Sequence, residues 1–158
     1  PARGEPPQNR VIRPRSPRTG QRYGRLMADP STVAPITVML ADDDDRFRTL
    51  VARVLEDDGF SVLAIAHDAR SAVTAAREHR PDVVILDLVM EGSDGLSTLH
   101  EILSNDPHQS VLVISSLFDY AIEQEVVSLG AWYLEKAEGL EALEHQLQSI
   151  ASITRPRR

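Results

Sequence analysis

The spacing of apolar side chains changes repeatedly along this chain, from continuous runs to a helical period. Ile36 to Ala41 is a short, β-branched apolar run, as expected for a buried strand. Apolar residues from 47 to 55 then recur at i, i+3, i+4, i+7 and i+8, which predicts one face of a helix. The pattern repeats five times, and we predict strands at 36–41, 60–66, 83–87, 111–114 and 131–135, each followed by a helix.

Local end signals support these boundaries. Asp44 and Asp45 are expected to cap the first helix, and Gly59 to end it. Asp68 is a candidate N-cap for a helix over 69–79, which stops before Pro81. Strands that alternate with helices favour right-handed crossovers and a parallel sheet covered on both faces. The sequence therefore predicts a doubly wound α/β domain, with a five-stranded parallel sheet of (β/α)5 type.

Size and composition exclude several classes of protein. The 158 residues allow one ordinary domain, and the absence of cysteine excludes disulfide scaffolds, thiolate metal sites and cysteine nucleophiles. No apolar stretch reaches the roughly 18 to 20 residues of a membrane span, so we expect no membrane association and a cytoplasmic location. The net charge of -7 argues against direct binding to nucleic acid.

Charge is distributed unevenly along the chain. Residues 1–34 contain seven arginines and two acidic residues, whereas residues 35–154 contain seven basic and 22 acidic residues. We predict that 1–34 is a disordered Arg/Pro-rich extension, with Met27 as the expected natural start. A folded domain is predicted over 35–153 and a basic tail over 154–158. The chain as given is expected to act as a single domain, or as a truncated protein that has lost an output domain.

Polar residues follow four of the predicted strands, where ligands bind in folds of this type. Asp42 and Asp43 follow the first strand, Asp87 ends the third, Ser115 follows the fourth and Lys136 the fifth. No glycine-rich phosphate loop follows any strand. Three converging carboxylates would repel one another without a cation, and hard oxygen ligands favour Mg²⁺. The set predicts an aspartate that accepts a phosphoryl group, assisted by a hydroxyl and an ammonium group.

Four segments, in order, resemble one known family. They are VMLADDDD, PDVVILDLVMEGSDG, VLVISS and GAWYLEK, within residues 36 to about 150. Together they resemble the response-regulator receiver domain, the CheY-like phosphoacceptor module of two-component signalling. This resemblance, and not the apolar spacing, implies the flavodoxin-like strand order 2-1-3-4-5.

The resemblance also implies a metal site and its cofactor. By position, Asp87 matches the phosphorylated aspartate of the family. Asp42, Asp43 and Asp87, with the backbone carbonyl of Val89, match the ligands of Mg²⁺. A sensor histidine kinase or phosphotransfer protein would donate the phosphoryl group, and the chain would assist its own phosphotransfer and dephosphorylation without being a conventional enzyme.

Three further positions correspond to the machinery of the family switch. Ser115 matches the hydroxyl residue that follows the phosphoryl group, Lys136 the lysine, and Tyr133 the aromatic residue whose rotamer reports activation. Phosphorylation is expected to shift the surface formed by helix 4, strand 5 and helix 5, and so to signal to a downstream protein. Whether the chain forms a homodimer stays open.

The sequence departs from the family pattern at several positions. Glu91 and Ala137 stand where many members have proline, and GAWYLEK is one residue shorter than the common motif. Val89 and Leu117 flank the acceptor and hydroxyl residues, and both are apolar. Because neither side chain can orient an attacking water, we expect slow self-dephosphorylation.

Two alternative functions compete with the signalling switch. A haloacid-dehalogenase-type phosphohydrolase also uses an aspartate at a strand end, but Arg46 stands where its DxDx[TV] motif has Thr or Val. The other alternative is a receiver-like interaction module that needs no phosphorylation, and the complete set of acidic, hydroxyl and lysine residues argues against it.

The five histidines show no metal-ligand spacing and are expected at the surface.

Overall fold

The computed structural model describes residues 34–92 and 94–154. The predictions for the N-terminal extension and for a start at Met27 lie outside these residues, apart from residue 34, and so does the basic tail beyond Thr154. The strands are β1 Thr37–Ala41, β2 Ser61–Ala66, β3 Val83–Asp87, β4 Ser110–Ser115 and β5 Trp132–Glu135. The helices are α1 Asp45–Asp57, α2 Ala69–His79, α3 Gly95–Asn105, α4 Tyr120–Ser128 and α5 Gly139–Ile153, with a 3-10 turn η1 at Lys136–Glu138.

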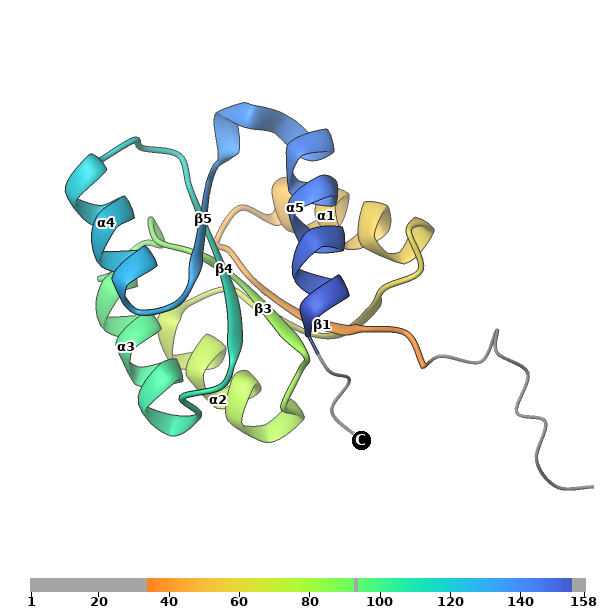
Figure 1. Ribbon diagram of the computed structural model, residues 1–158, viewed down its shortest axis with the longest axis horizontal. Coiled ribbons are helices and arrows are strands. Elements are labelled where there is room, and N and C mark those ends of the chain that lie inside the picture. The colour runs from red at the N-terminus through yellow and green to blue at the C-terminus, as the bar shows by residue number, and fades with distance from the viewer. Residues whose placement is uncertain (1–33, 93, 155–158) are drawn as a thin grey trace, which may run out of the picture. The chain divides into compact units, whose positions relative to one another are not determined.

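All five strands pair in parallel in one sheet of order β2-β1-β3-β4-β5. Helices cover both faces of this sheet (Figure 1). The predicted doubly wound α/β fold and its 2-1-3-4-5 order are therefore confirmed. Because every strand runs in the same direction, the carboxyl ends of β1, β3, β4 and β5 lie at one edge of the sheet.

The core is divided by the sheet into two apolar layers. One layer contains side chains of α2, α3 and α4, among them Leu99 and Val126. The other contains side chains of α1 and α5, among them Leu55 and Leu147. Every residue of β3 is buried, and successive apolar residues of this strand enter opposite layers, which explains its unbroken apolar run.

The N-termini of α1 and α2 carry the predicted caps Asp44 and Asp68, whereas Asp45, also expected as a cap, is the first residue of α1. Asp44 accepts hydrogen bonds from the backbone N–H groups of Arg46 and Phe47 at 2.9 and 3.2 Å. Asp68 accepts from the Ser71 N–H at 2.7 Å, within a capping box. These backbone hydrogen bonds lower the pKa values of both carboxyl groups. The caps therefore stabilise α1 and α2 most when they are ionised.

Two local features were not anticipated from the apolar spacing. Leu50 falls in the predicted buried stripe of α1, but its side chain is 48% exposed. The stripe is wider than the face that the sheet covers, so a residue at its margin reaches solvent. Gly95 begins α3 so close to the backbone of Leu88 that a Cβ atom would collide with it.

In the described part of the chain, no helix has the length and apolar composition needed to cross a membrane.

Candidate functional site

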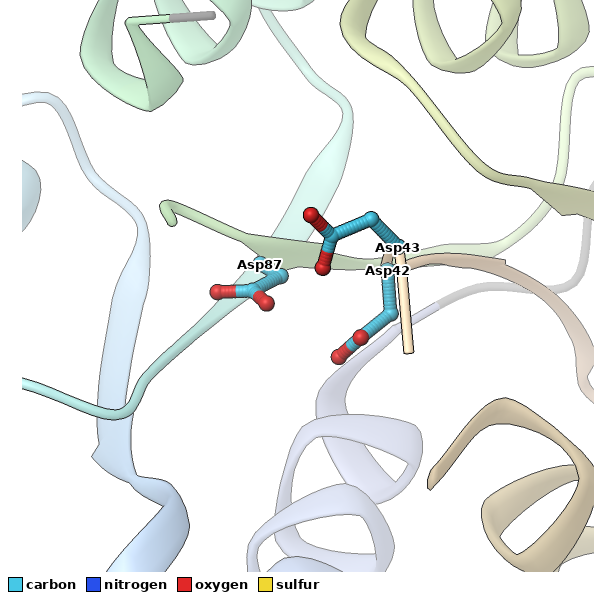
Figure 2. A group of neighbouring side chains, drawn as sticks. All are labelled: Asp42, Asp43 and Asp87. Carbon is cyan, nitrogen blue, oxygen red and sulfur yellow. The ribbon is translucent and has the colours of Figure 1, made fainter. Parts of the chain in front are cut away.

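Three carboxylates gather at the carboxyl edge of the sheet. Asp42 and Asp43 follow β1, and Asp87 ends the neighbouring strand β3. One oxygen from each of the three lies within 4.8 Å of the others (Figure 2). Asp42 and Asp87 are 0% and 1% exposed, whereas Asp43 is exposed to solvent. The structure thus brings together the three aspartates that the sequence singled out.

Lys136 is the cation that faces this cluster. Its Nζ atom lies 2.6 Å from Oδ2 of Asp42 and 2.7 Å from Oδ2 of Asp87. The same ammonium group lies 4.4 Å from the centre of the Phe47 ring, within cation–π range. One ammonium group therefore serves two buried carboxylates, and the cluster keeps an excess of negative charge.

Burial and pairing shift the pKa values of the central pair. Desolvation by burial raises the pKa of Asp87, although hydrogen bonds from Lys136 and from the Val89 N–H act in the opposite direction. Burial by itself would lower the pKa of Lys136, but its contacts with Asp42 and Asp87 outweigh that effect and raise it. Lys136 is therefore a permanent cation at neutral pH, and Asp87 is a carboxylate held in unfavourable surroundings.

Backbone groups hold the three carboxylates in place. Asp42 Oδ1 accepts from the Asp44 N–H at 2.9 Å, and Asp87 Oδ1 accepts from the Val89 N–H at 2.9 Å. Asp43 Oδ2 accepts from the Glu91 N–H at 2.7 Å, which links the end of β1 to the loop after β3. The guanidinium group of Arg48 donates to the carbonyl oxygen of Asp42.

Ser115 and Tyr133 meet at the backbone of Leu117. The Ser115 hydroxyl donates to the Leu117 carbonyl at 2.9 Å and accepts from the Leu117 N–H at 3.2 Å. The Tyr133 hydroxyl donates to the same carbonyl at 2.9 Å. Among the described residues, Ser115 makes no hydrogen bond to an aspartate of the cluster. Both switch candidates therefore form hydrogen bonds with the loop after β4.

The residues of the cluster fit a hard divalent cation. All three side chains offer oxygen ligands, which Mg²⁺ prefers. Asp42 Oδ2 is fully buried and, apart from its ion pair with Lys136, has no hydrogen bond of good geometry within the described chain. A buried carboxylate oxygen that lacks a hydrogen bond is costly unless positive charge approaches it. The donor set, the spacing and the charge excess all favour a cation here.

Three contacts of the site were not predicted from the sequence. These are the Phe47 ring beside Lys136, the Glu91 N–H on Asp43 and the Leu117 carbonyl that Ser115 and Tyr133 share. The sequence gives a weak indication of the Phe47 contact, because Phe47 lies four residues after Asp43 on the apolar stripe of α1. It gives no indication of the two backbone contacts, since almost any residue type offers an N–H or a carbonyl group.

A parallel sheet with an acidic cluster at its carboxyl edge, next to a hydroxyl and a lysine, defines a class of doubly wound α/β domains with a charged site at the strand ends. Comparison with known proteins narrows this class. The model of the response regulator receiver domain family matches residues 38–148, and the chain belongs to that family, the receiver module of two-component systems.

Individual relatives agree with this assignment. Protein-glutamate methylesterase/protein-glutamine glutaminase 2 of Anaeromyxobacter dehalogenans is 42% identical over 98 residues, which cover 61% of this chain and 28% of that protein. Probable transcriptional regulatory protein TcrX of Mycobacterium tuberculosis is 32% identical over 119 residues, covering 73% and 50%. The chain spans half or less of the length of these two curated relatives.

A solved structure shows the same arrangement of strands and helices. The two-component response regulator of the LuxR family from Aurantimonas sp. SI85-9A1 superposes with a TM-score of 0.71 at 27% sequence identity. The superposition covers 78% of this chain and 90% of that chain. The likeness therefore extends over nearly the whole described domain.

Proposed function

We propose that this chain is a phosphorylation-dependent response regulator that accepts a phosphoryl group on Asp87 from a sensor histidine kinase or a phosphotransfer protein. The single observation that supports this most strongly is the buried Asp87 carboxylate, which lies within 4.8 Å of two further aspartates and 2.7 Å from the Lys136 Nζ atom. A buried carboxylate in reach of a phosphoryl donor, with a cation beside it, is a suitable nucleophile.

In this proposal, Asp42, Asp43, Asp87 and the carbonyl group of Val89 hold Mg²⁺. The bound ion would neutralise the carboxylates and withdraw electron density from the phosphoryl oxygens. An oxygen of Asp87 attacks the phosphorus atom, the P–N bond to the donor imidazole breaks, and its electron pair stays on the imidazole nitrogen. Lys136 then moves from the Asp87 oxygen to an oxygen of the new acyl phosphate.

The same proposal gives Ser115 and Tyr133 the role of a switch. The Ser115 hydroxyl would leave the Leu117 carbonyl and donate to a phosphoryl oxygen, because a charged acceptor forms the stronger hydrogen bond. The Leu117 carbonyl also accepts from Tyr133, so movement of this loop would reach β5. The surface of α4, β5 and α5 would then change and signal to a downstream protein.

The setting of the proposed regulator follows from the same function. We expect the chain to act in the cytoplasm, where kinase and target are available, without direct binding to membrane or nucleic acid. It would be a signalling phosphoacceptor and not a conventional enzyme, although one relative carries a methylesterase name. Whether the chain forms a homodimer stays open.

Intact-mass measurement with a small phosphodonor tests the proposal. The chain is incubated with Mg²⁺ and acetyl phosphate as wild type, as Asp87→Asn and as Asp94→Asn. Asp94 is a matched control because it is an exposed acidic cap of α3, and asparagine caps equally well. We expect a gain of one phosphoryl group in the wild type and the control, and none in Asp87→Asn.

The alternatives predict different outcomes of the same assay. Sustained hydrolysis of the donor that depends on Asp42 would support the haloacid-dehalogenase-type hydrolase. No modification of the wild type would leave the phosphorylation-independent interaction module. Either result would overturn the proposed phosphoacceptor role of Asp87.

A further inference from the structure

Three arginines on α2 and at its C-terminal end have no counter-ion. Arg70 and Arg77 lie two helical turns apart on α2, and Arg80 is the C-cap residue. All three are exposed, and within residues 34–92 and 94–154 their guanidinium groups make no hydrogen bond or ion pair. Residues 35–154 contain only seven basic side chains against 22 acidic ones, and three of the seven lie on this one helix and its cap.

Two of these arginines line a cavity between α2 and the end of α3. The cavity has a volume of about 400 Å³, and its wall includes Arg77 and Arg80. Val73, Ala76 and Ile102 supply apolar wall, and the last two belong to the buried core. This volume lies in the range of small-molecule sites. The cavity adjoins the segment that enters β4, whereas Asp87 is at the carboxyl end of β3, so the two sites are separate.

The backbone at Arg80 is unusual for an arginine. Its φ angle is +46°, and it is the one non-glycine residue of the described chain with a positive φ. At a helix C-terminus this left-handed conformation favours glycine, because a Cβ atom strains it. Here an arginine that lines the cavity occupies the strained position.

A buried amide completes the polar lining. Gln109 is 6% exposed, and its Nε2 group donates to the carbonyl oxygens of Pro81 and Ser110 at 3.1 Å each. These contacts set the orientation of the amide, and its Oε1 atom has no hydrogen-bond partner in the described part of the chain. Gln109 lines the same cavity as Arg77 and Arg80. It offers an acceptor for a hydroxyl or N–H group of a ligand.

We propose that this cavity binds a small phosphate ester of nucleotide size. Arg77 and Arg80 offer two planar forks of N–H donors, which suit the dianionic phosphate group. The apolar wall suits the organic part of the ester, and Gln109 and Asn105 suit its hydroxyl groups. The carboxylate of Asp106 also lines the cavity, but it already accepts from the His108 N–H at 3.0 Å. A free phosphate ion would use the arginines alone and would bind more weakly.

Calorimetric titration with adenosine 5′-monophosphate tests the proposal, beside inorganic phosphate and adenosine. It is done without Mg²⁺ and repeated in the Asp87→Asn variant, so that the phosphoacceptor site contributes nothing. We expect saturable binding of one nucleotide, phosphate weaker by roughly tenfold or more, and no binding of adenosine. Chemical-shift changes at the side-chain amide of Gln109 would locate the ligand.

The variants separate the cavity from general charge attraction. Arg77→Gln combined with Arg80→Asn removes both guanidinium groups and keeps residue types that a helix and a left-handed cap tolerate. We expect a loss of affinity of roughly ten- to a hundredfold, because each charged hydrogen bond contributes strongly. Arg53→Gln, on an exposed position of α1, is the control for loss of a cation away from the cavity and should leave affinity unchanged.

Three results would overturn the proposed cavity. They are no saturable nucleotide binding to the wild type, equal affinity for nucleotide and inorganic phosphate, or equal losses in the double variant and the Arg53→Gln control. None of them bears on phosphorylation of Asp87, which the intact-mass assay tests separately.

Discussion

Replacing Lys136 by methionine removes the one ammonium group that faces the acidic cluster and keeps a side chain of similar length. Its Nζ atom lies 2.6 and 2.7 Å from oxygens of Asp42 and Asp87. With an effective dielectric constant of about 20, each contact corresponds to a gross attraction of roughly 6 kcal/mol. At 4.8 Å or less, the two carboxylates repel each other by at least about 3.5 kcal/mol in the same treatment.

The net effect is smaller than these gross values, since burying the three charged groups costs desolvation free energy. Breaking a buried ion pair by removing one partner typically costs about 3–5 kcal/mol. We therefore expect Lys136→Met to lower the free energy of unfolding by that amount in the absence of divalent cations. This would be a large part of the roughly 5–15 kcal/mol that stabilise a domain.

Urea unfolding followed by circular dichroism measures this difference. The wild type and Lys136→Met are compared in EDTA and in excess Mg²⁺, with Arg53→Met as a control for loss of an exposed, unpaired cation. Mg²⁺ should stabilise Lys136→Met more than the wild type, because a bound cation replaces the missing positive charge. Equal stability of Lys136→Met and wild type in EDTA would refute the electrostatic reasoning, and a stability gap that Mg²⁺ leaves unchanged would refute a cation site at this cluster.

Three further predictions follow from the site and its supports. Burial raises the pKa of Asp87 in the folded protein above its value in the unfolded chain, so the ionised carboxylate destabilises the fold at a pH above the folded-state pKa. Without metal, Asp87→Asn should therefore be more stable than the wild type at neutral pH. The difference should shrink as the pH falls through the folded-state pKa of Asp87, and urea titrations at several pH values measure it. Val89 and Leu117, each two positions after Asp87 (the proposed acceptor) and Ser115, are 45% and 66% exposed. Val89→Asn with Leu117→Lys should speed loss of the phosphoryl group severalfold in an intact-mass time course, whereas an unchanged rate would contradict the proposal that the apolar residues cannot orient an attacking water. Gly95→Ala should lower the free energy of unfolding by about 1–3 kcal/mol in urea titrations, because its Cβ atom collides with the Leu88 backbone, and full stability would mean that α3 can shift freely.

The strand and helix order could be predicted because the chain changes its apolar period at each element. Asp42, Asp43 and Asp87 could be placed together for the same reason, since parallel strands bring their carboxyl ends to one edge. The exposure of Leu50 could not be predicted, because periodicity shows which residues share a helix face but not how far the sheet covers it. The sequence therefore predicts which helices and strands form more reliably than it predicts whether a residue at the margin of an apolar helix face is buried.

The side-chain contacts of the two switch candidates could not be predicted either. Ser115 and Tyr133 lie 18 positions apart, and their shared partner is a backbone carbonyl, which any residue at position 117 would supply. The rotamer of Ser115 depends on the path of the loop after β4, which no local pattern specifies. The residue types at strand ends thus indicate chemistry, while the hydrogen bonds between them need the folded loops.

The hydrogen bonds of Ser115 have a consequence for how readily the loop after β4 rearranges. Leu117 is 66% exposed, so water can replace the serine hydroxyl at both its N–H and its carbonyl group when the side chain rotates. Exchanging both hydrogen bonds costs about 1–3 kcal/mol, at about 0.5–1.5 kcal/mol for each. At that difference, on the order of a hundredth to a tenth of molecules would have the serine turned away before any phosphoryl group arrives. A modifying group would then enrich a conformation that the resting protein already visits.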